Sequence, residues 1–394
     1  MQNNIKKVAK MNTNTIICEY NPFHNGHKYQ IDRIKAQSDD PITAIMSGSF
    51  TQRGDVAIYN KYQRASSALK NGADLVIELP TVYAVSSAQT FAGAGVEISK
   101  ALGLTKSLCF SSEDSVDKLF KAAELMESDE FNVLIKNYMK KGQYYPQAVA
   151  TALGEISAEL AEVCSKPNNI LALEYIKSIR NTGIGVTVIE RKGASHDSNE
   201  VSEGIASASK IRELIFKGNG VSELMPGYEC YSNPAYFEKL SSAIMYRLRS
   251  MTISEMENLP EISEGLENRL YKAARECGSI DELLNEAKTK RYTMARLRRI
   301  LCYALLGITD DMQKTPVPYL RILGFNSVGE TLLREIKRKT SLPLIINVAD
   351  GYKKLDEGAG RIFDVDLRAS DIRALAETII SPCGSDFTSY IVKA

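Results

Sequence analysis

Two histidines near the start of the sequence have a type and a spacing that suit phosphate chemistry. The sequence contains three histidines in all, and His24 and His27 are three residues apart. On a helical turn this spacing places both imidazoles on one face. At a helix N-terminus, where free N–H groups and the dipole favour anions, they would donate hydrogen bonds to phosphoryl oxygens. The alternative is a capped loop with two surface histidines, because an HxxH pair is common by chance.

The residues around the pair favour a tight turn that leads into a helix. Asn21-Pro22 forces a turn, since proline fixes its own φ and restricts the residue before it. Gly26 lets the backbone approach a ligand closely. An apolar run at residues 15–18 precedes the motif and a helical pattern at 26–36 follows it. The motif is therefore expected between a strand and a helix.

Short apolar runs alternate with helical patterns through the first half of the sequence. Strands are expected at residues 15–18, 42–46, 75–79, 107–110 and 186–189, and helices at 26–36, 61–70, 87–102, 116–160 and 170–180. This alternation predicts an α/β fold, a Rossmann-like doubly wound parallel sheet covered on both faces. Such sheets bind ligands beyond the carboxyl ends of their strands, near a switch in strand order. The histidine motif falls at such an end.

The second half of the sequence has a different pattern of apolar residues. Pro226-Gly227 and Asn233-Pro234 mark a linker, and residues 236–306 carry a helical pattern. We expect a nucleotide-binding catalytic domain at residues 1–225 and a mainly helical domain at 226–394. In the mixed tail of the second domain, residues 341–348 are expected to form a strand and 369–380 a helix.

Composition excludes several classes of protein. Hydrophobic residues make up 44% and charged residues 25%, the balance of a globular domain and not of a disordered chain. The 49 basic and 48 acidic residues nearly cancel, so anion binding must come from local clusters. Seven scattered cysteines without a CxxC pair argue against a zinc ribbon or a disulfide framework. They fit a cytoplasmic location, and no apolar run is long enough to predict a membrane partner.

Residues 205–212 form a second candidate anion site. Ser207 and Ser209 precede an apolar helical run, with Lys210 and Arg212 beside them. Hydroxyl groups at a helix start either cap the helix or hold a phosphate, to which the two cations would add charge. A fixed second anion site would suit a ligand with more than one phosphate, although an ordinary N-cap is the alternative.

Three further cations lie at positions expected near the crevice, together with the third histidine. Arg191 comes directly after the last expected strand and His196 follows shortly after. His196 would face the ligand or only stabilise its loop. Arg53 and Lys61 flank the loop after the second expected strand. They would hold a small substrate or a target base, or belong to a solvated turn.

A basic segment predicts RNA contact. Residues 288–299 contain six cations and no acid, with Tyr292 available for stacking on a base. A solvated helix face is the alternative, but an acid-free window is unusual in a chain of balanced charge. Residues 337–339 form a weaker second cluster. The predicted RNA-binding residues are Lys288, Lys290, Arg291, Arg296, Arg298 and Arg299.

The longer string around the histidines, EYNPFHNGH at residues 19–27, resembles the bacterial tRNA(Met) cytidine acetate ligases. Its HxGH portion is similar to the signature of the nucleotidyltransferase superfamily that is related to class I aminoacyl-tRNA synthetases. Further similar blocks lie at residues 46–54, 59–61, 73–80, 167–171, 190–191, 195–198, 288–299 and 323–326. The resemblance implies a HIGH-type Rossmann-like domain followed by a helical tRNA-binding region.

The resemblance also implies an activity. The enzyme would activate acetate with ATP to give acetyl-adenylate and pyrophosphate, and Mg²⁺ is expected to accompany the triphosphate. It would then acetylate the N4 amine of the wobble cytidine of elongator tRNA(Met), giving N4-acetylcytidine. The rival interpretations are a small-molecule adenylyltransferase that uses the same HxGH site and a non-catalytic RNA-binding protein on the same scaffold.

The resemblance carries roles to individual residues. His24, His27, Lys210 and Arg212 would be catalytic. Two departures from the family pattern, Ser111 and Ala172 in place of glycine, bear on the shape of the adenine pocket. The residues implied to contact ATP are Ile17, Cys18, Glu19, Tyr20, Asn21, Pro22, Phe23, His24, Asn25, Gly26, His27, Ser111, Asn168, Asn169 and Arg191.

Overall fold

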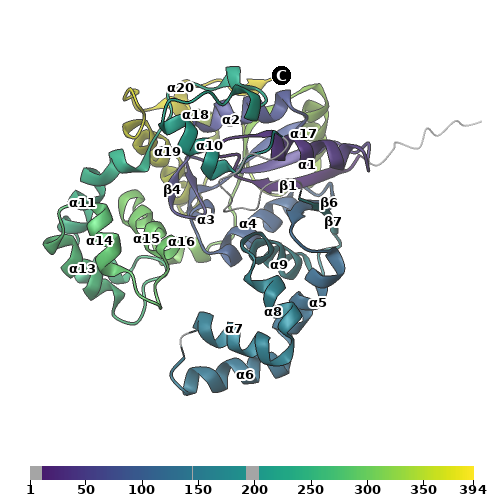
Figure 1. Cartoon of the computed structure of the whole chain (residues 1–394). Coiled ribbons are helices and arrows are strands. Elements are labelled where there is room, and N and C mark those ends of the chain that lie inside the picture. The colour runs from purple at the N-terminus through teal and green to yellow at the C-terminus, as the bar shows by residue number, and fades with distance from the viewer. Residues whose placement is uncertain (1–10, 144, 192–203) are drawn as a thin grey trace, which may run out of the picture.

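A central sheet organises the computed structural model, which describes residues 11–143, 145–191 and 204–394. The sheet has eight strands in the order β10-β8-β5-β2-β1-β6-β7, with β9 beside β8 (Figure 1). All five strands expected from the sequence are present and differ from their expected bounds by two residues or fewer. They are β1 (Thr13–Cys18), β2 (Ile42–Ser47), β5 (Leu75–Leu79), β6 (Thr105–Ser112) and β7 (Gly185–Glu190).

These five strands form the predicted parallel, doubly wound sheet. From β1 the chain builds outward through β2 and β5 on one side, then returns to add β6 and β7 on the other. The strand order therefore reverses between β1 and β6, which is the point where such a sheet opens a crevice. The carboxyl ends of these two strands, at Cys18 and Ser112, flank it.

Alternate residues of each strand face opposite layers of helices, because side chains of a strand alternate in direction. In β1, Ile16 belongs to the apolar cluster under α1 and α2, whereas Ile17 belongs to the larger cluster on the opposite face. Helix α4 lies so close to β1 that a Cβ on Gly95 would stand 2.4 Å from Ile17 Cδ1. The helices of these layers are α1 (Asn25–Lys35), α2 (Lys61–Lys70), α3 (Thr81–Ala84), α4 (Ala88–Ala101) and α9 (Pro167–Ile179).

The helical stretch expected at residues 116–160 is divided into four helices. The side chain of Ser128 caps α6 and that of Ser157 caps α8. Helices α6 and α7 pack on each other around a small apolar cluster of their own and project away from the sheet (Figure 1). The four helices are α5 (Val116–Glu127), α6 (Asp129–Lys140), α7 (Tyr145–Ile156) and α8 (Ala158–Ser165).

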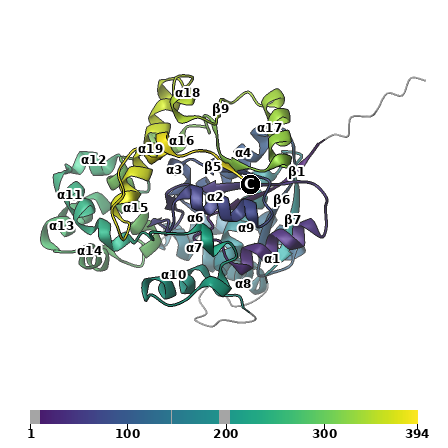
Figure 2. The ribbon, with the colours of Figure 1, turned by 90° about the horizontal axis from the view of Figure 1, so that it is seen from above.

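From residue 204 to residue 314 the chain is mainly helical, and this includes the stretch at 236–306 where a helical pattern was expected. Figures 1 and 2 show α11, α13, α14 and α15 gathered on one side of the sheet domain. The elements of this stretch are α10 (Ala208–Phe216), three short 3₁₀ turns within 222–240, α11 (Ser241–Ser250), α12 (Ile253–Glu257), α13 (Leu266–Glu276), α14 (Ile280–Ala287), α15 (Met294–Leu306) and α16 (Asp310–Lys314).

The tail then returns to the sheet, which the sequence did not lead us to expect. Strand β8 (Leu320–Phe325) pairs antiparallel with β5, and β10 (Val392–Lys393) pairs with β8. The strand expected at 341–348 is reduced to β9 (Leu344–Ile345), because Asn347 caps α18 (Val348–Tyr352). The remaining helices are α17 (Ser327–Lys339), α19 (Glu357–Leu375) and α20 (Ser385–Thr388).

The helix expected at 369–380 starts earlier and ends earlier than predicted. Helix α19 begins after Asp356, whose side chain accepts the Ala359 N–H at 2.8 Å. It ends at Leu375, and beyond it the Thr378 N–H bonds the Pro234 carbonyl at 2.9 Å. Pairing with the linker thus replaces the last helical turn.

Four buried charges anchor the returning tail. Lys61 Nζ lies 3.0 Å from carboxylate oxygens of both Glu78 and Asp386. Arg321 lies 3.2 Å from Glu78 and 3.0 Å from Asp386. All four side chains are almost fully buried, and the two positive charges match the two negative ones. A buried pair that lost one partner would leave an uncompensated charge, so this cluster fixes α20 against the sheet.

Candidate active site

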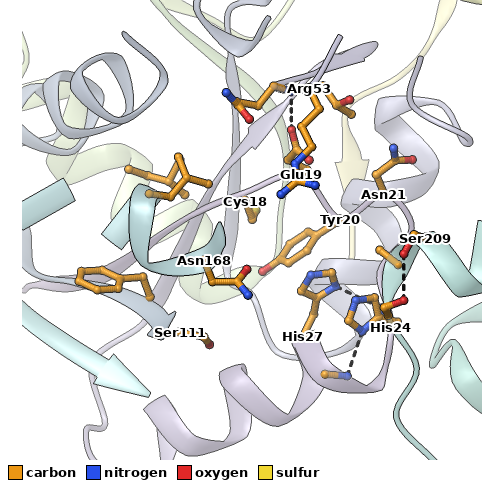
Figure 3. Close-up of a pocket in the computed structure, with 18 of the residues that line it drawn as sticks. Cys18, Glu19, Tyr20, Asn21, His24, His27, Arg53, Ser111, Asn168 and Ser209 are labelled. Atoms are coloured by element: carbon orange, nitrogen blue, oxygen red, sulfur yellow. Dashed lines mark hydrogen bonds between the residues drawn. The ribbon is translucent and has the colours of Figure 1, made fainter. Parts of the chain in front are cut away.

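A cavity of about 630 Å³ opens at the point where the strand order reverses. The ends of β1 and β6 supply Cys18 and Ser111, and the N-terminus of α1 supplies the two histidines (Figure 3). The N-terminus of α10, the first turn of α9, the β3–β4 hairpin (Phe50–Thr51 and Asp55–Val56) and the start of α15 complete the wall. The cavity thus lies at the predicted position of the ligand crevice.

His24 and His27 hold each other and the start of α1 in place. His24 is the N-cap residue, and its Nδ1 accepts the Gly26 N–H at 3.0 Å. His27 Nδ1 in turn accepts the His24 N–H at 3.3 Å. Because each neutral ring uses Nδ1 as an acceptor, its proton lies on Nε2. Both rings therefore have an Nε2–H donor available for a ligand.

Burial keeps both imidazoles uncharged. Desolvation, with the positive charges of Arg191 and Arg212, lowers the pKa of His24 to about 3. Desolvation, with His24 and Arg191, also holds the pKa of His27 well below its usual value. At neutral pH the pair therefore offers neutral N–H donors, and the positive charge of the site comes from arginines.

The second predicted anion site faces the same cavity. Ser207 caps α10, its Oγ accepting the Lys210 N–H at 3.2 Å, and Ser209 Oγ lies 3.0 Å from Ser207 Oγ. Arg212 lines the cavity and donates to the Asn21 carbonyl at 2.8 Å. Lys210 does not line it, because its Nζ is 3.0 Å from Glu213. Of the two predicted cations, only Arg212 reaches the cavity in this arrangement.

Most residues that were implied to contact ATP line the cavity. Phe23 does not, because it is buried against Tyr20 with ring centroids 4.8 Å apart. Asn25 does not line it either, because its Nδ2 donates to the carbonyls of Gly204 and Glu223, both at 2.8 Å. Pro22 and Asn169 also lie outside the lining. The lining members are Ile17, Cys18, Glu19, Tyr20, Asn21, His24, Gly26, His27, Ser111, Asn168 and Arg191.

Asn169 has a supporting position behind the cavity. Its Nδ2 donates to Asp114 at 2.7 Å and to the Val163 carbonyl at 3.0 Å, and its Oδ1 accepts the Glu113 N–H at 3.2 Å. These bonds tie the loop after β6 to the start of α9. The neighbouring Asn168 is left on the cavity side.

At the β3–β4 hairpin the cavity wall includes Arg298, which the sequence had assigned to RNA binding alone. Asp55 lies 3.3 Å from Arg298 Nη2, so the β3–β4 hairpin and α15 meet there. Gly54, at φ +73°, lies so close to α15 that an added Cβ would be 2.3 Å from the Arg299 amide nitrogen. Arg53 lines this part of the wall as expected, whereas Lys61 is buried in the ionic cluster below and does not.

The basic segment at residues 288–299 contains no acidic residue, but glutamates from an earlier part of the chain contact it in the structure. Arg299 lies 2.6 Å from Glu261, and Arg296 Nε donates to the Glu261 carbonyl at 3.0 Å. Arg291 lies 3.5 Å from Glu264. Lys288 and Lys290 are exposed, with no ion pair recorded among the described residues. Arg298 belongs to the cavity wall, so the six cations do not form one surface.

Three further expectations, on His196, on a metal and on a membrane, can be compared with the structure. His196 lies outside the described residues. In the described part of the chain, no three His, Cys, Asp or Glu side chains gather as a metal site would require. None of the helices in those same ranges is long and apolar enough to cross a bilayer.

The fold and the paired histidines define a class, the HIGH-type nucleotidyltransferases. The family model described as HIGH Nucleotidyl Transferase matches residues 11–384. A tRNA(Met) cytidine acetate ligase of Thermoanaerobacter sp. (strain X514) is 39% identical over 96% of this chain and 98% of its own. The ligase of Clostridium tetani is 35% identical over 97% of this chain and all of its own length. The chain belongs to this family of tRNA(Met) cytidine acetate ligases within the HIGH nucleotidyltransferases.

Solved structures agree with this assignment. Thermotoga maritima TmcAL in its apo form superimposes with a TM-score of 0.91 at 28% identity, over 97% of this chain and 99% of that one. The same protein bound to alpha-thio ATP gives a TM-score of 0.90 at the same identity and coverage.

Proposed function

We propose that this protein activates acetate with ATP and acetylates the N4 amine of the wobble cytidine of elongator tRNA(Met). The observation that carries the proposal is the pair of neutral Nε2–H donors on His24 and His27, held at the N-terminus of α1 in the cavity. Donors fixed in advance stabilise charge that develops on a phosphoryl group. The names of the relatives and the ATP analogue bound by the Thermotoga protein support the same conclusion.

In the first step an acetate oxygen attacks the α-phosphorus of ATP in line, and pyrophosphate leaves. His24 and His27 would bind the α- and β-phosphate oxygens. Arg191, Arg212 and the capped start of α10 would offset the charge on the leaving pyrophosphate. Lys210 would join them after exchanging Glu213 for a phosphate. The protein needs to transfer few protons in this step, because it accelerates the reaction by positioning the substrates and stabilising charge.

Magnesium would enter as part of the nucleotide. The described residues do not provide a protein cage for a divalent cation, so they do not fit a resident metal. No step of the proposed mechanism passes through a metal held by side chains.

In the second step the cytidine must leave its stack to reach the mixed anhydride. Helix α15 supplies Met294, Ala295 and Arg298 to the cavity wall, so RNA bound at this helix would lie beside the cavity. The exposed Lys288, Lys290 and Arg291 lie just before this helix, where they would contact RNA phosphates. On this basis we place tRNA binding at the start of α15, within the second domain predicted at residues 226–394.

A two-stage assay tests the function. The first stage measures pyrophosphate exchange into ATP with and without acetate, and the second measures acetyl transfer to bulk tRNA. We expect exchange that requires acetate, and transfer that requires tRNA. Exchange without acetate would contradict the ligase, and acetate-dependent exchange without transfer would favour a small-molecule adenylyltransferase. An RNA-binding protein without catalysis would show neither.

A further inference from the structure

Two carboxylates among the described residues line the cavity, and they have different surroundings. Asp55 is ion-paired with Arg298, at 3.3 Å. Glu19 is recorded in no ion pair in the described ranges, and its Oε1 accepts the Gln52 N–H at 2.6 Å. Burial raises the pKa of Asp55 as well, against the charge of Arg298, so basicity does not separate the two carboxylates. Glu19 is the better placed to take a proton because its carboxylate is not engaged by Arg298 as that of Asp55 is.

Glu19 is held at both ends. Arg64 Nη1 donates to its backbone carbonyl at 2.6 Å, from a side chain that is fully buried. The Gln52 backbone N–H fixes its carboxylate, and Gln52 Nε2 is in turn held by the Ser86 carbonyl at 2.8 Å. The next residue, Tyr20, has φ +47°, a left-handed conformation that a non-glycine residue adopts at a cost. The backbone turns there so that Glu19 and the histidine motif both face the cavity.

The position of Glu19 suits the second substrate. Figure 3 shows Glu19 between Tyr20 and Arg53, on the side of the cavity away from His24. The histidines and α10 form the proposed phosphate-binding part of the wall, whereas Arg53, Asp55 and Arg298 come from the β3–β4 hairpin and α15. An acetyl group on the α-phosphate would lie between these two parts, and we expect the amine to approach from the α15 side.

We propose that Glu19 accepts the proton of the N4 amine during acetyl transfer, an inference that rests on the proposed function. The N4 lone pair forms a bond to the acetyl carbonyl carbon, and the bond from that carbon to the adenylate oxygen breaks. AMP leaves with the electron pair. One N4 proton passes to Glu19 Oε2, and from there to water after the products leave.

The electrostatics of Glu19 suit a general base. Burial raises the pKa of this carboxyl, and the Gln52 amide and the charges of Arg212, Arg53 and Arg64 oppose the rise. A raised pKa makes the carboxylate a stronger base, and the arginines limit that rise. The acceptor is the ionised form, so acetyl transfer is lost as pH falls through the raised pKa of Glu19.

The test compares the two half-reactions in Glu19→Gln. The amide still accepts the Gln52 N–H but takes no proton. We expect single-turnover acetyl transfer to fall by about 10²–10⁴-fold, the usual contribution of a general base, and acetate-dependent exchange to fall far less. Glu124→Gln, on the exposed face of α5, is the matched control and should leave both rates unchanged. Glu19→Asp should regain part of the transfer rate.

The outcomes separate the inference from the proposed function. Equal losses of exchange and transfer in Glu19→Gln would overturn the inference, since Glu19 would then serve ATP or acetate and not the amine. Unimpaired transfer would overturn it as well. If the unmodified protein showed neither activity, the proposed function itself would fail. Wild-type transfer that is insensitive to pH on the acid side, while exchange is unaffected, would also contradict a carboxylate base.

Discussion

The imidazoles of His24 and His27 are stacked with their ring centroids 3.8 Å apart, and each accepts a backbone N–H through Nδ1. The two rings therefore have both a structural role and a ligand-binding role. Nδ1 of each ring caps the start of α1, and Nε2–H of each ring is left for the ligand. The two roles can be separated by substitution.

His24→Asn should keep the helix cap and lose the phosphate donor. Asparagine is as good an N-cap as any residue, so the free energy of unfolding should change by less than about 1 kcal/mol. Removing one preorganised donor should lower the exchange rate by about 10²–10³-fold. Chemical denaturation and pyrophosphate exchange measure the two effects. His24→Ala is the control that should lose the cap as well, and wild-type exchange in His24→Asn would refute the donor role.

Neither histidine should titrate in the physiological range. The pKa of His24 is lowered to about 3 and that of His27 is also well below its usual value, chiefly by burial. Nitrogen-15 NMR of the imidazoles should show neutral, Nε2-protonated rings from pH 8 to about pH 5. A ring that titrates near its ordinary value would contradict this.

The same shifts predict how stability depends on pH. In the unfolded chain the two histidines take up protons below about pH 6.5, whereas in the folded protein they do not until far lower pH. The unfolded state then binds more protons, so the free energy of unfolding should fall as pH drops from about 6.5 towards 5. Denaturant titrations should show a smaller fall in His24→Gln/His27→Gln. An equal fall in the variant would show that other groups cause it.

Gly54→Ala should disturb the contact between the β3–β4 hairpin and α15. An added Cβ would stand 2.3 Å from the Arg299 amide nitrogen, and φ is +73°. Gly218 has the same φ of +73° with open space around it, so Gly218→Ala carries the backbone cost of about 1–2 kcal/mol alone. We expect Gly54→Ala to lower the free energy of unfolding by clearly more than Gly218→Ala. Equal losses of stability in the two variants would mean that α15 shifts to accommodate the added Cβ at little cost.

RNA affinity should depend on the exposed part of the basic segment. Lys288→Ala/Lys290→Ala/Arg291→Ala should weaken tRNA binding and lower the slope of log K against log salt by up to about three, one for each phosphate contact. Lys353→Ala/Lys354→Ala, on another exposed segment, is the charge control. Filter binding across a salt series measures both. An unchanged slope in the triple variant would place the RNA elsewhere.

The sequence located the parallel sheet well for a physical reason. Strands such as β2 and β5 are buried on both faces, so they are mainly apolar runs between helical patterns. Strand β8, which contains Arg321, was not predicted. That charge is acceptable in a buried strand only through Glu78 and Asp386, which lie far away in the sequence.

The candidate site divides in the same way. The part built by one local motif, from Glu19 to His27, was predictable because a strand end, a turn and a helix N-terminus are contiguous in the chain. The part built by tertiary contact was not. Nothing in the spacing of Asp55 and Arg298 shows that they meet at 3.3 Å, or that Arg298 faces the cavity and not the solvent.

The central claim is tested most directly by following the acetyl group. The protein would be incubated with ATP, carbon-labelled acetate and elongator tRNA(Met), and the tRNA digested to oligonucleotides for mass spectrometry. The account predicts labelled N4-acetylcytidine from the wobble position, dependent on ATP and abolished in His27→Ala. Label that remains on a small nucleotide, or an acetylated product formed equally well by His27→Ala, would contradict it.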